Sequence, residues 1–218
     1  MARLVFEKKG NAVWISHLDL MRLFQRAFKR ASLPLKHTQG YNPKPSVSIA
    51  LPLSVGVESC CELLDFELDC ETPSEEELAQ KLNAALVEGV RVTGFVDSGR
   101  KIRDLALLLC EVRLEYDHGV REDASERIRA LFARESLPVT KKSKNGPVEQ
   151  DIIPMIKGIE VAAEEREIVI RALVCCQNPS MNPMQISGAV ERYLPDLKPD
   201  HAVYRRLEIY DSNETIFR

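Results

Sequence analysis

The stretch SHLDLMRLFQRAFKRASLPLKHTQGYNPKPSVSIALPLSVGVES, residues 16–59, predicts a helix, a polar loop and a strand in that order. Ser16 can cap the helix, with Asp19 as the acid of a capping box. Pro34 disfavours helix at the residue before it, so we expect the helix to end near Ala31 or Ser32. Apolar side chains recur at helical spacing on the face that we expect to be buried: Leu20, Leu23, Phe24, Ala27, Phe28 and Ala31.

The other side of this helix is basic, and the loop at 35–46 adds further polar side chains. Two prolines and Gly40, which favours a positive φ, predict an ordered loop. Cations beside an exposed aromatic ring suit single-stranded RNA, because cations follow the phosphates and the ring stacks on a base. The plainer interpretation is a solvated helix face. We call the following residues the basic surface: Arg22, Arg26, Lys29, Arg30, Lys36, His37, Gln39, Tyr41, Asn42 and Lys44.

The net charge of −3 conceals a strong asymmetry along the chain. Residues 1–48 carry nine lysines and arginines against two acids, whereas residues 58–88 carry ten acids and a single lysine. Such a division favours an anionic partner on one side of the molecule, although the two regions can also attract each other within the fold.

The order of predicted elements in the first part of the chain is β-α-β-β-α-β. This order is typical of a ferredoxin-like unit, a four-stranded antiparallel sheet with two helices on one face. We therefore expect an α+β protein whose first domain is residues 1–97. The segments are strands at 3–8, 47–51, 58–68 and 90–96, with helices at 16–31 and 74–87, and residues 12–15 as a short apolar continuation of the first strand.

A polar segment at 97–104 is the predicted linker. After it the same order begins again, and we expect residues 105–218 to form a second ferredoxin-like domain with an extra strand. Gly188 is expected to weaken or break the last helix. The segments are strands at 105–116, 137–142, 150–156 and 203–210, at least one further strand within 159–174 that is clearest at 167–174, and helices at 121–135 and 182–193.

Composition limits the classes of function. The 218 residues are 44% apolar and 29% charged, which is typical of a soluble globular protein. No apolar run approaches 18 residues and the N-terminus lacks a signal-peptide core, so we expect no membrane association and a cytoplasmic location. No phosphate-binding loop, dinucleotide fingerprint, zinc-protease motif or nucleophile elbow occurs.

The cysteines follow no metal-binding spacing, since no C-x-x-C pair occurs. We expect no metal and no cofactor. Most of the cysteines lie in apolar, strand-like runs and are expected to be small buried side chains. They are Cys60, Cys61, Cys70, Cys110, Cys175 and Cys176.

Two residues are candidates for catalysis, His17 at the start of the first helix and Tyr41 in the loop. A neutral His17 near Tyr41 and Lys44 can act as a general base for cleaving RNA at a 2′-hydroxyl. The structural alternative is that His17 hydrogen-bonds loop backbone and fixes the turn at 39–45, with Asp19 serving only the helix cap.

Three motifs carry a resemblance to a known family: ISHLDLMR at 15–22, QGYNPKP at 39–45 and ALPLSVGVES at 50–59. They resemble the radical-SAM-linked domain of unknown function, which is found fused to or beside cobalamin-binding radical SAM proteins. Tyr41 stands where phenylalanine is commoner in that family, and Gly146-Pro147 stand where a more basic loop is expected. This chain lacks C-x-x-x-C-x-x-C, so the resemblance implies an accessory role beside a radical SAM partner.

Three hypotheses follow from the sequence. The leading one is a non-catalytic accessory protein of a radical SAM enzyme that binds RNA or another anionic substrate on the basic surface. The second is an endoribonuclease or RNA-modifying enzyme that uses His17 and Tyr41. The third is a protein-interaction module that binds no nucleic acid.

Overall fold

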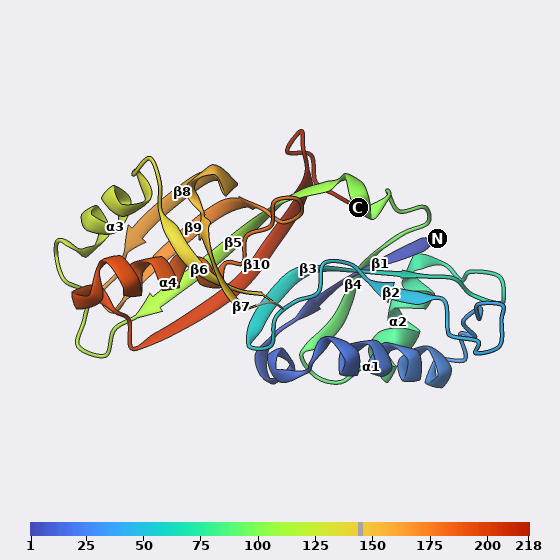
Figure 1. The fold of residues 1–218 in the computed structure, drawn as a ribbon. Coiled ribbons are helices and arrows are strands. Elements are labelled where there is room, and N and C mark those ends of the chain that lie inside the picture. The colour runs from blue at the N-terminus through green and yellow to red at the C-terminus, as the bar shows by residue number, and fades with distance from the viewer. Residues whose placement is uncertain (144–145) are drawn as a thin grey trace. The chain divides into compact units, whose positions relative to one another are not determined.

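The structure is a computed structural model, and it describes residues 1–143 and 146–218. The chain has a mixed α+β fold of mostly antiparallel strands, with four α-helices among the described residues (Figure 1). It divides into two compact units. Unit 1 contains Met1–Asp104 together with Phe217–Arg218, and unit 2 contains Leu105–Ile216.

In unit 1 the first strand lies between the fourth and the third, and the second strand pairs with the third. All of these pairs are antiparallel. The strands are β1 (Ala2–Lys8), β2 (Val47–Ile49), β3 (Val57–Phe66) and β4 (Val90–Val96).

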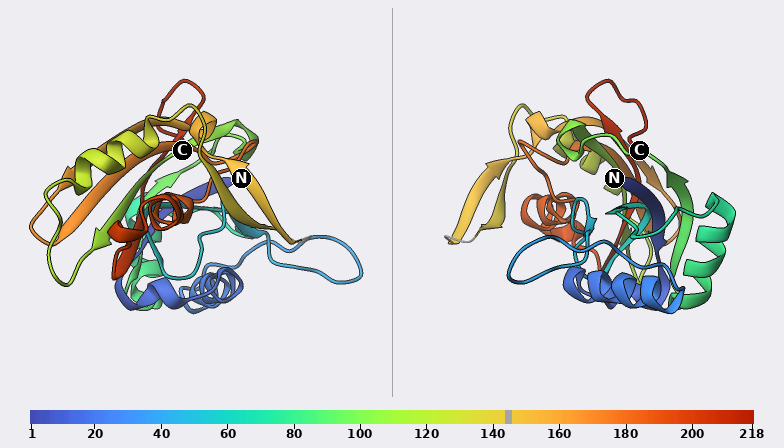
Figure 2. Two further views of the ribbon diagram at one scale, coloured as in Figure 1. Left: turned by 60° about the vertical axis from the view of Figure 1, so that its left-hand side comes forward. Right: turned by 90° about the vertical axis from the view of Figure 1, so that its right-hand side faces the viewer.

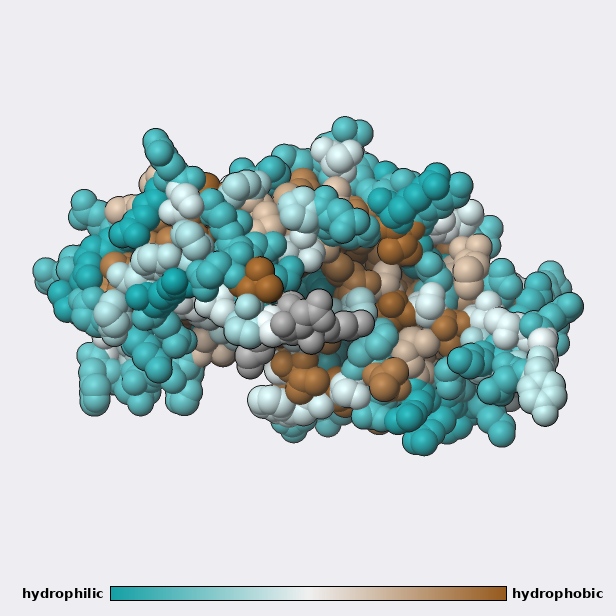
Figure 3. Space-filling model, viewed as in Figure 1, coloured by the Kyte–Doolittle hydropathy of each residue, from teal (hydrophilic) through white to brown (hydrophobic). Residues whose placement is uncertain are grey.

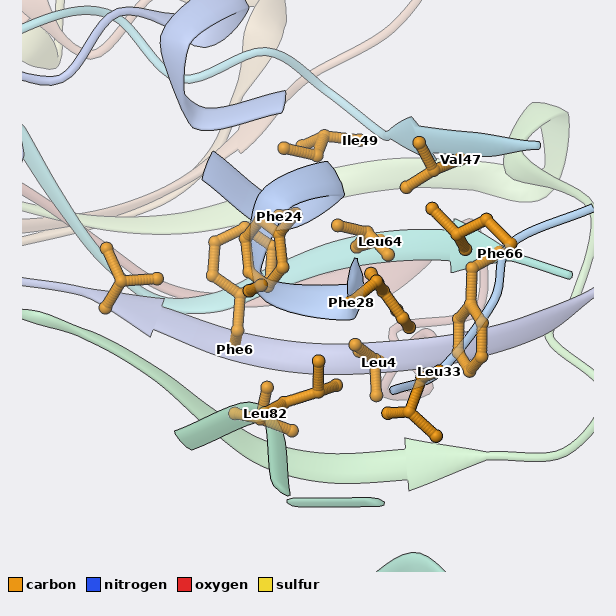
Figure 4. Packing of buried hydrophobic residues seen from close by; sticks show 14 of the residues in the cluster. Leu4, Phe6, Phe24, Phe28, Leu33, Val47, Ile49, Leu64, Phe66 and Leu82 are labelled. Carbon is orange, nitrogen blue, oxygen red and sulfur yellow. The ribbon is translucent and has the colours of Figure 1, made fainter. Parts of the chain in front are cut away.

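Both helices of unit 1, α1 (His17–Arg30) and α2 (Glu75–Ala85), cover one face of these strands (Figure 1). A serine caps each of them, since Ser16 accepts from the backbone N–H of Asp19 and Ser74 from that of Glu77. Their apolar stripes enter a shared core in which Phe6 meets Phe24 edge to face at 4.7 Å (Figure 4). The core thus fixes which side of α1 is buried, as its periodicity predicts.

The segment before α1 differs from the prediction. Residues 12–15 do not continue the first strand, because Gly10–Trp14 forms the 3-10 turn η1. Gly10 begins this turn at a φ of 55°, and the N–H of Ile15 bonds the carbonyl of Ala12. The turn redirects the chain from β1 into α1.

In unit 2 the strand order is β10-β5-β9-β8, again with antiparallel pairs. The predicted strand at 150–156 is wrong, because β7 ends at Asp151 and the 3-10 turn η3 (Ile153–Met155) precedes β8. The extra strand is half of a separate hairpin of β6 with β7. The strands are β5 (Leu105–Glu115), β6 (Pro138–Ser143), β7 (Gly146–Asp151), β8 (Ile156–Ala163), β9 (Glu167–Cys175) and β10 (His201–Asp211).

The helices of unit 2 are α3 (Ala124–Phe132) and α4 (Met184–Tyr193), both shorter than predicted. Gly188 does not break α4, which is continuous across it. A Cβ at Gly188 would lie 3.8 Å from Val139, so hairpin strand β6 passes close to the helix there. The short 3-10 turns η2 (Ile102–Asp104) and η4 (Pro195–Leu197) precede β5 and β10.

Candidate nucleic-acid interface

Helix α1 turns its cationic side chains away from the core. Arg22, Arg26 and Lys29 are exposed, and Arg26 and Lys29 have no ion-pair partner among the described residues. Arg22 instead bonds Asp19 at 2.9 Å, one turn earlier on the helix. Arg30 donates to the carbonyl of Ala85, the last residue of α2, so it also serves the packing of the two helices.

The start of α1 has a charged cap. Asp19 accepts from the hydroxyl of Ser16 at 2.7 Å, which is a side-chain bond in place of the bond to the Ser16 backbone N–H that a capping box has. The hydrogen bond from Ser16, followed by that from Arg22, lowers the pKa of Asp19. The carboxylate therefore stays ionised beside the helix N-terminus and partly neutralises Arg22.

A buried lysine positions this helix, and the sequence analysis missed it. Lys8 Nζ donates to the carbonyls of Val13 at 3.1 Å and Ile15 at 2.8 Å, which ties η1 to the end of β1. Burial lowers the pKa of Lys8, and the nearby carboxylate of Glu62 partly offsets this. The burial of Lys8 could have been predicted from the period of the strand. Lys8 lies four positions after Leu4, so both side chains lie on the face of the strand that packs on the core.

The loop at 36–46 is a finger held by backbone hydrogen bonds at its base. Thr38 N–H donates to the Lys44 carbonyl at 2.8 Å, and Ser46 N–H to the Lys36 carbonyl at 2.7 Å. Gly40 has a φ of 140°, as predicted, and the tip carries Tyr41 with its side chain fully exposed. Figure 2 shows the loop projecting beyond the strands of unit 1.

The residues of the basic surface therefore all lie in unit 1. They are divided between two elements, the outer face of α1 and the finger that follows its C-terminal end. Lys36, His37, Gln39, Asn42 and Lys44 are all exposed. His17 is placed differently. It begins α1, whereas the finger follows the other end of a helix that is about 20 Å long at 1.5 Å per residue. The geometry therefore separates His17 from Tyr41 and Lys44.

Exposed apolar side chains near the start of α1 form a second feature that the sequence analysis missed. Trp14 is 70% exposed, Leu18 66% and Val55 47%. The Trp14 ring lies against Gly56, where a Cβ would be 3.5 Å away, and Gly56 N–H bonds the Val13 carbonyl. We call these three side chains the apolar patch. Figure 3 shows apolar residues reaching the surface beside this end of α1.

The chemistry available elsewhere is limited. Burial raises the pKa of the Cys110 and Cys176 thiols to about 12, so neither is a thiolate nucleophile. Cys61 is buried as well, Cys60 and Cys175 are half-buried, and Cys70 is exposed. Within residues 1–143 and 146–218, no group of three or more His, Cys, Asp or Glu is placed to hold a metal ion.

Two further observations concern unit 2 and the membrane. Lys141 of β6 donates to the Ser180 carbonyl at 3.0 Å, while residues 144 and 145, just before Gly146-Pro147, lie outside the described residues. None of the described helices is both long enough and apolar enough to cross a bilayer.

Residues 2–183 match a family described as uncharacterized proteins conserved in bacteria (DUF2344), and the chain belongs to that family. No curated protein matches the sequence. The chain is similar to a chain in the crystal structure of a Cbf5-Nop10-Gar1 complex, at 11% identity and a TM-score of 0.51 over 95% of this chain and 48% of that one. It thus spans about half the length of that structure, and the likeness concerns the fold alone. An unknown protein from Galdieria sulphuraria is also similar, at 11% identity and a TM-score of 0.27 over 94% and 96% of the two chains.

Proposed function

We propose that this member of the DUF2344 family binds single-stranded RNA, or another extended anionic substrate, on the basic surface. In this proposal it works as a non-catalytic accessory protein of a radical SAM enzyme. The observation that carries the binding proposal is the pairing of two exposed cations, Arg26 and Lys29, with a finger that presents Tyr41 and Lys44; within the described part of the chain neither cation has an ion-pair partner. Cations that follow phosphates and a ring that stacks on a base are the two parts of a single-strand site.

Charge reversal tests the binding site. We expect Arg26→Glu/Lys44→Glu, which changes one residue on α1 and one on the finger, to abolish most of the affinity for a fluorescent 12-nucleotide RNA in an anisotropy titration. Each phosphate contact on a single strand contributes about 0.7 to the slope of log K against log salt. Losing two contacts should therefore lower that slope by about 1.4.

The matched control is Arg91→Glu/Lys101→Glu, which makes the same charge change at exposed residues of unit 1 outside the basic surface. This control should lose little affinity, and both variants should keep the circular dichroism of the parent protein. Equal losses in the two double variants would show a general charge effect and overturn the site. Undiminished binding by Arg26→Glu/Lys44→Glu would overturn it as well.

The accessory role rests on the resemblance to radical-SAM-linked domains, and the apolar patch favours it. Aromatic and aliphatic side chains that are exposed together are characteristic of protein-docking surfaces. The same patch supports the alternative of a pure interaction module. The enzyme alternative has less support, because α1 separates His17 from Tyr41; absence of RNA cleavage by the parent protein would remove it.

We also propose that both units are ferredoxin-like and that the protein is cytoplasmic. The strand orders β4-β1-β3-β2 and β10-β5-β9-β8 support the first part, since each places the first of these four strands between the last and the third; the hairpin of β6 with β7 is not counted. The free cysteines are compatible with a reducing compartment.

A further inference from the structure

A hollow of about 460 Å³ lies between the C-terminal end of α1 and the base of the finger. Gln25, Phe28 and Lys29 line it from the helix, Leu33 and Leu35 from the segment that follows, and His37 from the finger. Sites for small organic ligands usually measure about 300–1,000 Å³, so the hollow is large enough for one.

The walls of this hollow are fixed by backbone hydrogen bonds. Helix α1 ends with Ser32 in the left-handed region at a φ of 55°, and Leu33 N–H donates back to the Phe28 carbonyl at 2.9 Å. This is a Schellman cap, and it turns the chain across the end of the helix. Leu35 then bridges to Leu68, and His37 to Pro45. The hollow is therefore formed before any ligand binds.

Its lining combines an apolar floor with a polar rim. Phe28, Leu33 and Leu35 are buried and provide the floor. Gln25 brings an amide that can both donate and accept a hydrogen bond. Lys29 brings a cation with no ion-pair partner among the residues that the structure describes. A flat apolar ring with a hydrogen-bonding edge, attached to an anion, fits all three features.

We propose that the hollow holds one unpaired nucleobase of the bound RNA, which makes it the base-reading part of the basic surface. In this arrangement the base lies on the apolar floor, Gln25 bonds its polar edge, and Lys29 pairs with the phosphate of the same nucleotide. Unpaired bases that leave the stack are commonly bound in this way by single-strand RNA proteins. The inference rests on the proposed function and names the part of the ligand that its site recognises.

The test compares RNA with a strand that has no bases. We would titrate the full protein with fluorescent 12-nucleotide RNAs of a single base type, and with an abasic strand of equal length and charge. A base held in the hollow should make the preferred RNA bind about 5- to 150-fold more tightly than the abasic strand. Gln25→Trp fills the hollow without changing the charge. It should lower the preference for RNA over the abasic strand at least fivefold and leave the affinity for the abasic strand unchanged.

A second variant separates recognition from space filling. Gln25→Ala removes the amide but keeps the hollow open, so it should reduce the differences in affinity among the four RNAs and should retain most of the preference over the abasic strand. If Gln25→Trp does not keep the circular dichroism of the folded protein, Gln25→Ala alone provides the test. Differences in affinity among the four RNAs that are unchanged in Gln25→Ala would then overturn the inference.

The outcomes distinguish this inference from the function on which it rests. RNA binding with a steep salt dependence, but with the same RNA affinity and base preference in both Gln25 variants, overturns the nucleobase site and leaves the basic surface standing. Failure of the parent protein to bind any of the strands at low salt overturns both.

Discussion

Arg3 is held from several directions inside unit 1. Its guanidinium forms a two-pronged ion pair with Asp65, at 2.6 and 3.0 Å, and donates to the Arg100 carbonyl at 2.8 Å. It also lies 5.3 Å from the centre of the Phe217 ring. A buried cation with this many partners has little freedom to move, because each movement breaks a charge-assisted hydrogen bond.

The space beside Arg3 gives the first prediction. A Cβ at Gly99 would lie 2.6 Å from the Arg3 guanidinium carbon, so Gly99→Ala must displace the side chain from its partners. We expect a loss of about 1–3 kcal/mol in the free energy of unfolding, which is typical of overpacking. Urea denaturation followed by circular dichroism measures it.

The matched control is Gly158→Ala in β8, where a Cβ would meet nothing within 4 Å. Neither glycine has a positive φ, so the two variants differ mainly in the space available. The control should keep or slightly raise the stability, because alanine is favoured over glycine within a strand. Equal stabilities of the two variants would show that Arg3 can move without loss.

At the scale of elements, three neighbouring strands of unit 2 meet around one acid. Glu111 on β5 is buried and bonds Arg113 at 2.9 Å and Arg171 of β9 at 3.0 Å, with Arg205 of β10 at 3.8 Å. Burial alone would raise the pKa of Glu111, but the hydrogen bonds from Arg113 and Arg171 outweigh it, and the pKa is lowered. The ionised form thus links β10, β5 and β9.

This cluster gives a pH-dependent prediction. A carboxyl whose pKa is lower in the folded state contributes stability above its unfolded pKa of about 4.3 and loses it as the pH falls through the folded value. Glu111→Gln should therefore be about 1–2 kcal/mol less stable than the parent at pH 7, since its arginines are partly exposed. The difference should shrink below pH 4.

Denaturation series from pH 7 to pH 3 would measure that difference. Glu160→Gln is the control, because Glu160 is exposed on β8 and has no ion-pair partner among the described residues. It should follow the parent at every pH. A difference between Glu111→Gln and the parent that does not change with pH would contradict the assigned role of the charge.

The same scale shows what the sequence can predict. Helix α1 and its basic face were predictable, because Phe24 and Phe28 recur one helical turn apart on one face, while Arg22 and Arg26 recur with the same period on the opposite face. The hollow was not predictable, since it depends on the cap at Ser32 and on the bridge from Leu35 to Leu68, a contact across 33 positions of the chain. Strand β6 was predicted to within one residue. Strand β7 was misassigned, because its boundary with β8 lies in an apolar run that periodicity does not divide.

At the scale of the whole molecule, one helix presents different chemistry at its two ends. The apolar patch lies at the N-terminal end of α1, while the hollow and the finger lie at the C-terminal end. The helix separates them by about 20 Å. An RNA on the finger and a protein on the patch can therefore bind unit 1 at the same time. This separation allows the accessory role to be tested apart from RNA binding.

Trp14 reports on this separation because it is the only tryptophan in the chain and is 70% exposed. A radical SAM partner that covers the apolar patch should shift its fluorescence to shorter wavelength, whereas RNA at the other end of α1 should leave the wavelength unchanged. Trp14→Ala should weaken partner binding roughly thirtyfold in calorimetry, as expected for a central aromatic contact. Val87→Ala, at an exposed apolar residue outside the patch, should leave it intact. A shift produced by RNA alone would place the nucleic acid on the patch and would contradict the division of α1 into two binding ends.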